Sequence, residues 1–267
     1  METILNILGG VALLLWGIRM VRTGVTRSFG AELRAALSVS AKNRFTAVLA
    51  GLGVTTAIQS STATALIVSA FAGQGLIPVA AALAIMLGAD VGTTLVVQIL
   101  SFNLSWLSPL LLAVGVFGFL GAERRKPRNF ARICIGLGLM LLALRLIVMA
   151  SAPLRETDAF SVLLQPLANE PLLAVLVFAL VTWASHSSVA VVLLVVSLVS
   201  MQVLSLQLAF ALVLGANLGG AMTAVGMTMA AAPVARRVPM GNLLMRLVGV
   251  LVVLPFLSNV QPYLAGL

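Results

Sequence analysis

The chain has 267 residues, of which 61% are hydrophobic and 9% are charged, and its mean hydropathy is +1.16. This composition provides too little polar surface for a soluble protein of this length, so we expect an all-α integral membrane protein. The net charge of +9 lies in a few loops beside hydrophobic segments, which indicates membrane topology and argues against nucleic acid as a partner. The single cysteine, Cys134, excludes a disulfide framework and a cysteine-based metal site.

The first half of the chain predicts three transmembrane helices and one re-entrant hairpin. The crossings are expected at residues 4–21, 76–101 and 106–120. No basic region precedes the first crossing, so we expect it to be retained rather than cleaved. Residues 26–40 are amphipathic, as in a helix that lies in the membrane interface.

The hairpin of this half is expected at about residues 45–72. The polar run Gln59-Ser60-Ser61-Thr62 interrupts this apolar segment near its middle. Each arm has about 13 residues and rises only about 20 Å, which is too short to cross the hydrocarbon core. The segment is therefore predicted to enter the membrane, turn at the polar run and leave on the same side.

The second half repeats this plan after a basic linker at residues 122–132. Its crossings are expected at residues 133–150, 204–229 and 243–257. A second re-entrant hairpin is predicted at about 172–200, broken at His186-Ser187-Ser188. The connectors are expected to carry charged residues: Arg155, Glu156, Asp158 and Glu170 before the hairpin, and Arg236 and Arg237 before the last crossing.

An internal duplication supports this division. When the chain is aligned with itself so that Gln59-Ser60-Ser61 lies on His186-Ser187-Ser188, positions 88–92 fall on 215–219 without a gap. More than a third of the positions from 54 to 92 are identical in this alignment. Polar residues kept at fixed places inside hydrophobic segments are typical of a transporter built from two repeats.

The repeats are expected at residues 1–121 and 133–267, and they are expected to be inverted. Each has three crossings, an odd number, so the second must enter the membrane from the opposite side to the first. Most arginines and lysines then lie on one side, in residues 22–44, 121–132 and 230–240. The positive-inside rule makes this side cytoplasmic and both termini external, in a multi-pass protein of the inner (plasma) membrane.

The two hairpin tips are the predicted binding sites. The second arm of each begins at a Ser-Ser pair, where free N–H groups, the helix dipole and the hydroxyls favour an anion. The last carbonyls of the first arms, at Ala57 and Ser185, have the opposite polarity and suit Na⁺. The alternative is that these serines only hydrogen-bond their own helices or help helices to pack.

Asp90 is the only carboxylate inside a predicted crossing, so we expect it to bind Na⁺ or a proton. The alternative is a salt bridge with Arg246. His186, the only histidine, is either a packing residue or part of the second tip. We expect no enzymatic activity, because neighbouring helical residues do not face each other and Ser187 lies in no G-x-S-x-G motif.

The doubled motifs resemble those of the type II sodium/phosphate cotransporters and their bacterial relatives. Gln59-Ser60-Ser61-Thr62 is followed by Gly88-Ala89-Asp90-Val91-Gly92-Thr93-Thr94, and His186-Ser187-Ser188 by Gly215-Ala216-Asn217-Leu218-Gly219. The resemblance covers nearly the whole chain. It implies two facing re-entrant hairpins that hold phosphate with Na⁺.

The resemblance also implies roles for individual residues. It places phosphate at Gln59, Ser60, Ser61, Ser187 and Ser188, and Na⁺ near Asp90 and Asn217. Beyond the resemblance, we expect Thr62 and His186 to contact phosphate as well, and Thr93, Ala57 and Ser185 to be further Na⁺ ligands. The chain departs from the family pattern at His186, which replaces a glutamine, and at Asp90, where many relatives have asparagine. A phosphate-regulatory helical domain follows the membrane part in many bacterial members, and we expect it to be missing here.

The function expected is Na⁺-coupled transport of inorganic phosphate by alternating access. The partners are phosphate, Na⁺ as the coupling ion and the lipid bilayer, with no other cofactor and with a homo-oligomer left open. Two alternatives stand beside it: a phosphate exporter or other anion transporter of the same fold, and a phosphate sensor that does not transport.

Overall fold

The computed structural model describes residues 2–102, 104, 106–153 and 165–257. Its helices are α1 (Glu2–Ser40), α2 (Arg44–Ile58), α3 (Ser61–Gly73), α4 (Val79–Ser101), α5 (Leu107–Gly121), α6 (Arg125–Ser151), α8 (Pro171–Ser185), α9 (Ser188–Ser200), α10 (Leu206–Met227) and α11 (Pro233–Val253). The short 3-10 helix η2 (Leu254–Phe256) extends α11. The part of the chain described contains no strand, so the predicted all-helical class is confirmed there.

By length and composition, five of the described helices can cross a membrane: α1, α4, α6, α10 and α11 with η2. They coincide with five of the six expected crossings. The sixth, at residues 106–120, is α5, which has 15 residues and is shorter than the roughly 20 needed to span the hydrocarbon core without adjustment.

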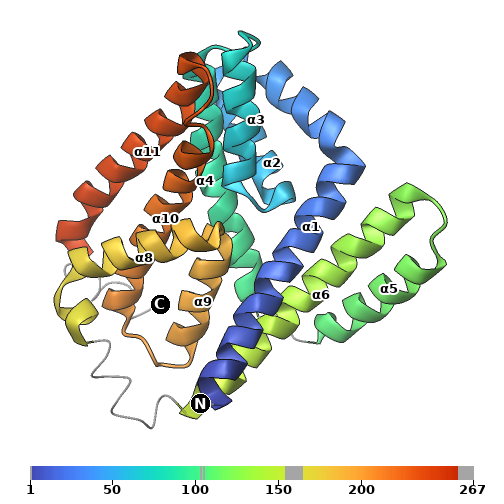
Figure 1. Cartoon of the computed structure of the whole chain (residues 1–267), viewed down its shortest axis with the longest axis vertical. Coiled ribbons are helices and arrows are strands. Elements are labelled where there is room, and N and C mark those ends of the chain that lie inside the picture. The colour runs from blue at the N-terminus through green and yellow to red at the C-terminus, as the bar shows by residue number, and fades with distance from the viewer. Residues whose placement is uncertain (1, 103, 105, 154–164, 258–267) are drawn as a thin grey trace.

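Helix α1 differs from its prediction, because residues 26–40 do not form a separate interfacial helix. They continue from the first apolar span as one helix of 39 residues, whose axis bends in its upper part (Figure 1). Residues 22–30 contain no proline or cap that would end the helix. Gly24, which could have weakened it, is buried against α6, where an added Cβ would lie 2.7 Å from the Asn129 carbonyl oxygen.

Two expected connectors are also helical in large part. Helix α6 begins at Arg125, inside the basic linker 122–132, and the Arg128 guanidinium lies 4.5 Å from the ring centre of Phe119 in α5. Helix α11 begins at Pro233, so Arg236 and Arg237 lie in its first turns and not in a loop. Proline is favoured at the first position of a helix, which explains the early start of α11.

The connector before α8 is described only in part. Arg155, Glu156 and Asp158 lie outside the described residues. Glu170 is the residue that precedes the first turn of α8.

Helices α1 and α6 pack closely through glycines. A Cβ on Gly17 would lie 2.8 Å from the carbonyl oxygen of Gly136, and one on Gly24 would lie 2.7 Å from that of Asn129. As residue numbers rise along α1, they fall along α6, so the two helices are antiparallel.

The same device joins α2 to α4 and α8 to α10, at equivalent positions of the two repeats. A Cβ on Gly88 would overlap the carbonyl oxygen of Val48, and a Cβ on Gly215 would overlap that of Val175. One turn later, Gly92 and Gly219 make the equivalent contacts. Each pair therefore fixes a broken segment against the long helix that follows it.

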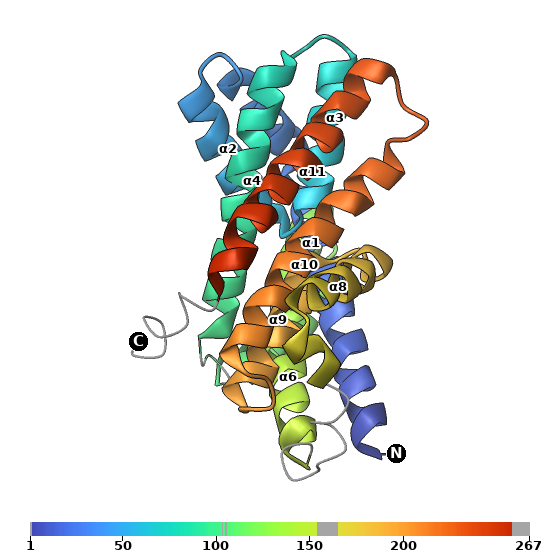
Figure 2. The same cartoon turned by 90° about the vertical axis from the view of Figure 1, so that its left-hand side faces the viewer.

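The directions of the long helices and of α3 and α9 can be followed in Figures 1 and 2. Helices α1, α3 and α10 run upward, and α4, α6, α9 and α11 run downward. The connections between α2 and α3 and between α8 and α9 both lie near mid-height (Figure 1).

Candidate functional site

The first helix break lies between α2 and α3. Gln59 adopts φ 57° and ψ 35°, in the left-handed region, and its N–H donates to the carbonyl oxygen of Thr55 at 2.7 Å. Ser60 is extended, and its hydroxyl oxygen accepts a hydrogen bond from the N–H of Ala63 at 3.1 Å. Gln59 therefore ends α2, and Ser60 caps the N-terminus of α3. Serine is among the residues most favoured as a helix N-cap.

The second break repeats this geometry at the equivalent place of the second repeat. His186 adopts φ 54° and ψ 22°, and Ser187 is extended with φ −148°. The Ser187 hydroxyl accepts from the N–H of Ala190 at 3.3 Å. The two breaks are thus built in the same way, although one has a glutamine where the other has a histidine.

The two breaks differ in burial. Gln59, Ser60 and Ser61 are buried, with 9%, 5% and 3% of their surface exposed. His186 is exposed, and Ser187 is half-buried. The Gln59 amide oxygen is buried without a hydrogen-bond partner, so the first break holds an acceptor that lacks a donor.

The first arm of each hairpin carries a buried threonine, and the two threonines differ in hydrogen bonding. Thr55 shares a hydrogen bond of 2.8 Å with Thr64, which ties the two arms of the first hairpin together. The equivalent positions are Thr182 and Val191, and valine offers no hydroxyl. The Thr182 hydroxyl oxygen is accordingly buried without a partner.

Two of the expected Na⁺ ligands use their hydroxyls to hydrogen-bond within their own helices. The Thr93 hydroxyl donates to the Ala89 carbonyl at 3.0 Å, and the Ser185 hydroxyl donates to the Thr182 carbonyl at 3.2 Å. Thr62 and Ala57 are half-buried, in the first turn of α3 and the last turn of α2.

Asp90 pairs with Arg246, the partner considered as the alternative to Na⁺. The Arg246 Nε donates to Asp90 Oδ2 at 3.2 Å, and Nη2 donates to Oδ1. The third guanidinium nitrogen, Nη1, donates to the main-chain oxygen of Asn217. The side chain of Arg246 is 4% exposed and that of Asp90 is 22% exposed, so the pair is largely removed from water.

Arg246 also lies next to the second break. A Cβ placed on Gly220 would be 3.2 Å from Arg246 Nη1 and 3.3 Å from the Ser188 hydroxyl oxygen, so both groups flank one point on α10. Sequence reasoning did not place Arg246 at an anion site. The available signal was that it is the only charged residue in the expected crossing 243–257.

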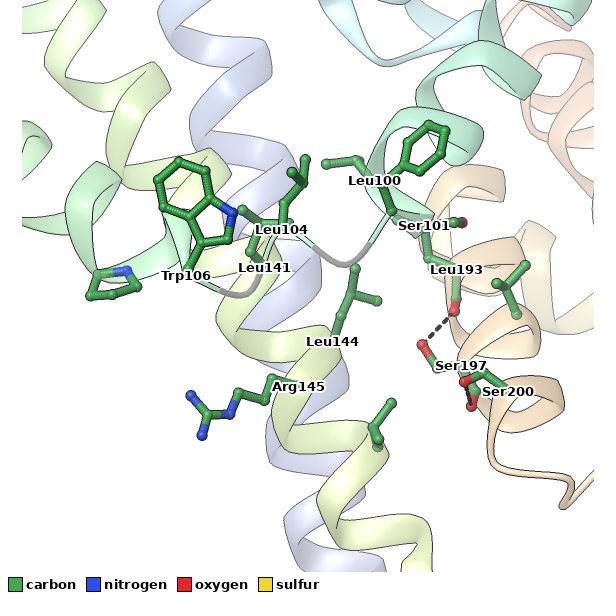
Figure 3. Close-up of a pocket in the computed structure, with 14 residues that line it drawn as sticks. Leu100, Ser101, Leu104, Trp106, Leu141, Leu144, Arg145, Leu193, Ser197 and Ser200 are labelled. Atoms are coloured by element: carbon green, nitrogen blue, oxygen red, sulfur yellow. Dashed lines mark hydrogen bonds between the residues drawn. The ribbon is translucent and has the colours of Figure 1, made fainter.

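A cavity of about 650 Å³ is shown in Figure 3, and no residue of either break is among those that line it. Leu100 and Ser101 of α4, Trp106 and Pro109 at the start of α5, Leu141, Leu144 and Arg145 of α6, and Leu193, Val196, Ser197 and Ser200 of α9 are among the residues that line it. Its wall is mostly apolar. The Ser197 and Ser200 hydroxyls, seen in Figure 3, donate to carbonyl oxygens of α9 itself.

The cavity separates surfaces whose equivalents are in contact elsewhere. The Ser69 hydroxyl of α3 donates to the Ala235 carbonyl of α11 at 2.5 Å. In the other repeat, the matching positions are Val196 on α9, which lines the cavity, and Ser108 on α5. The Ser108 hydroxyl instead donates to the Gly138 carbonyl of α6 at 2.8 Å.

The geometry of the described residues provides no group of three or more histidine, cysteine, aspartate or glutamate side chains that could hold a metal ion. A cation at either break would rely on main-chain, hydroxyl and amide oxygens, and the carboxylate of Asp90 is held by Arg246 beside the second break. Those are ligands of the kind that hard cations accept.

Comparison with known proteins gives relatives over nearly the whole chain. It is 48% identical over 256 residues to the Escherichia coli (strain K12) protein named "Putative inorganic phosphate export protein YjbB", and 47% identical to its namesake in Salmonella typhimurium. These alignments cover 96% of this chain and 47% of each relative, so the chain spans about half their length. It is 24% identical over 242 residues to "Uncharacterized protein YqeW" of Bacillus subtilis, covering 91% of this chain and 78% of that protein.

No solved structure matches the chain. The sequence does match a family model described as Na+/Pi-cotransporter, over residues 13–149 and 154–264. These two ranges include both helix breaks, Asp90, Asn217 and Arg246. The chain therefore belongs to the Na+/Pi-cotransporter family.

Proposed function

We propose that this chain transports inorganic phosphate across the inner (plasma) membrane, coupled to Na⁺, by alternating access. The observation that carries the proposal is the pair of helix breaks, which share one backbone geometry at equivalent positions of the repeat. Broken helices in a membrane are tolerated where they line a cavity or meet a ligand, because hydrocarbon cannot satisfy their free backbone groups.

The anion is expected at the starts of α3 and α9. The first N–H groups of a helix lack partners inside that helix, and the helix dipole is positive there. Ser61 and Ser188 are the first residues of these helices and would add their hydroxyls. Gln59 and His186, which precede the capping serines, would complete the two halves of a phosphate site.

Na⁺ is expected at the ends of α2 and α8, where carbonyl groups face outward. The unpartnered amide oxygen of Gln59 supports a cation at the first break, because a buried acceptor without a donor is costly unless a ligand satisfies it. Asp90, Asn217, Thr93, Ala57 and Ser185 would contribute further oxygens.

Two inverted repeats are a common architecture for alternating access, and several features support them here. Equivalent helices run in opposite directions in Figure 1: α1 against α6, α3 against α9, and α4 against α10. Helices α2 and α3, and likewise α8 and α9, have 13 to 15 residues each and meet at a break near mid-height (Figure 1), which favours two re-entrant hairpins. With the basic stretches cytoplasmic, both termini would be external.

Transport, and not catalysis, fits the site. Ser187 uses its hydroxyl oxygen as a helix cap, so it has a structural task in place of a nucleophilic one. The family description and the names of the Escherichia coli and Salmonella typhimurium relatives all refer to phosphate movement.

Export is the second candidate for direction. The Escherichia coli and Salmonella typhimurium relatives carry a name that describes phosphate export. An inverted-repeat carrier can work in either direction, since the gradients of Na⁺ and phosphate set the net flux.

The proposal can be tested with purified protein in proteoliposomes loaded with radiolabelled phosphate. We expect phosphate flux in both orientations of the gradient, accelerated by a Na⁺ gradient and not by an equal K⁺ gradient. Binding of phosphate without flux would support a phosphate sensor. Flux that is the same with and without a Na⁺ gradient would show that transport is not coupled to Na⁺.

A further inference from the structure

A buried ion pair joins the two halves of the molecule. Asp90 lies on α4 in the first repeat, and Arg246 lies on α11 in the second. Replacing a buried ion pair by apolar side chains is often neutral or stabilising, so such a pair is weak evidence for a purely structural role. Its position beside the second break calls for a functional one.

We infer that this pair couples the binding of the two substrates. Phosphate replaces Asp90 as the partner of Arg246, and Na⁺ replaces Arg246 as the partner of Asp90. Either replacement alone is unfavourable. The inference rests on the proposed function and assigns to Arg246 a role as a phosphate ligand. It also gives Asp90 a role in the empty carrier, where its carboxylate occupies the place of the substrate anion.

The chemistry of Arg246 fits an anion. The Asp90 carboxylate engages Nε and Nη2, the edge of the guanidinium that binds carboxylate and phosphate oxygens with two parallel hydrogen bonds. Nη1 is held by the Asn217 carbonyl, so the guanidinium stays oriented when the carboxylate leaves. Ser188, the first residue of α9, lies beside the same point of α10 as Nη1.

The chemistry of Asp90 fits a cation. Its side chain is 22% exposed against 4% for Arg246, so it is the more accessible member of the pair. Asn217, its equivalent in the second repeat, presents its main-chain oxygen to the same guanidinium. A carboxylate is a suitable Na⁺ ligand, because hard cations prefer oxygen ligands.

The coupling follows from the cost of an unpaired buried charge. If phosphate alone displaced Asp90, the carboxylate would remain buried without a counter-ion, next to an anion. If Na⁺ alone displaced Arg246, the guanidinium would remain unpaired. When both bind, each charge of the pair has a new partner, so each substrate raises the affinity for the other.

The test measures binding of radiolabelled phosphate to the purified full chain in NaCl and in KCl of equal ionic strength, together with thermal unfolding. The wild-type protein should bind phosphate at least about tenfold more tightly in NaCl, which corresponds to about 1.4 kcal/mol. Asp90→Asn should bind with similar affinity in both salts, because asparagine does not neutralise Arg246. Arg246→Gln should bind weakly in both, while Na⁺ raises its melting temperature more than that of the wild type.

Arg145→Gln is the matched control, since Arg145 lines the cavity on α6 and pairs with neither residue. It should keep the wild-type affinity and the wild-type dependence on Na⁺. The double variant Asp90→Asn/Arg246→Gln leaves no unpaired charge and covers the case in which a single variant fails to fold. It should bind phosphate weakly and with no preference for Na⁺.

The outcomes separate the two hypotheses. A wild-type protein that binds no phosphate in either salt would remove the proposed function itself. If the wild-type protein binds phosphate, and Asp90→Asn or the double variant keeps the wild-type dependence on Na⁺, the coupling role of the ion pair is wrong while the proposed function stands. Full phosphate affinity in Arg246→Gln would show that Arg246 is not a ligand.

Discussion

Each of the two helix breaks depends on the backbone conformation of one residue. Gln59 and His186 adopt φ values of 57° and 54°, a region that non-glycine residues rarely enter. This backbone choice lets one helix end and another begin within a few positions, and it leaves the serines to cap the second helix. The Ser-Ser pairs and the repeat were enough to locate both breaks from sequence. The unpartnered Gln59 oxygen could not be predicted, because it depends on which distant segments pack around the tip.

The two serines of each tip should respond differently to substitution. Ser187→Ala removes a helix cap, so we expect a loss of stability of about 1 kcal/mol, measured by thermal unfolding. Ser188→Ala leaves this cap intact but removes a hydroxyl beside Arg246. We expect it to weaken phosphate binding about tenfold or more, with little change in melting temperature. Equal affinities for Ser188→Ala and wild type would place the anion elsewhere.

At the scale of helices, glycine contacts position each broken segment. Gly88 and Gly215 lie against the carbonyl oxygens of Val48 and Val175, which belong to helix backbones and cannot rotate away. The alignment of these two glycines made the repeat visible in sequence. The starts of α6 and α11 were harder to predict, because basic residues such as Arg128 were assigned to loops although they can pack along a helix, as its contact with Phe119 shows.

The packing predicts a contrast among glycine substitutions. Gly88→Ala and Gly215→Ala should each destabilise the protein by about 1–3 kcal/mol, because the added methyl group meets main-chain atoms. Gly53→Ala in α2 is the control, since nothing lies within 4 Å of a Cβ at that position. It should be neutral or stabilising, as alanine favours helix more than glycine does. Similar melting temperatures for all three variants would contradict the close approach of α2 to α4.

At the scale of the whole molecule, the two halves are alike in sequence but not in packing. Helix α3 touches α11 through Ser69 and Ala235, whereas the equivalent surfaces of α9 and α5 are separated by the cavity of about 650 Å³. The repeat predicts which surfaces correspond. It cannot predict which pair of surfaces is in contact and which is separated, because the repeated sequence pattern is compatible with both.

Alternating access would exchange these two arrangements, and cross-linking can test the exchange. In a Cys134→Ser background, cysteines replacing Ser69 and Ala235 should be joined by a short bifunctional thiol reagent in the present conformation. Cysteines replacing Val196 and Ser108 should be joined only after the carrier reorients. Each cross-link should block phosphate flux. When the cross-linking reagent has a cleavable spacer, cleavage of the spacer should restore the flux. Flux that continues through a fully cross-linked 69–235 pair would exclude this surface as a gate.

The pairing of Asp90 with Arg246 has an electrical consequence. The two charges sum to zero, so the empty site would carry no net charge as it moves between the two faces of the membrane. A membrane potential would then act mainly on the loaded form, at about 2.3 kcal/mol for each net charge and each 100 mV. The return of the empty carrier would be nearly independent of voltage, and the potential would be used on the step that moves the cargo.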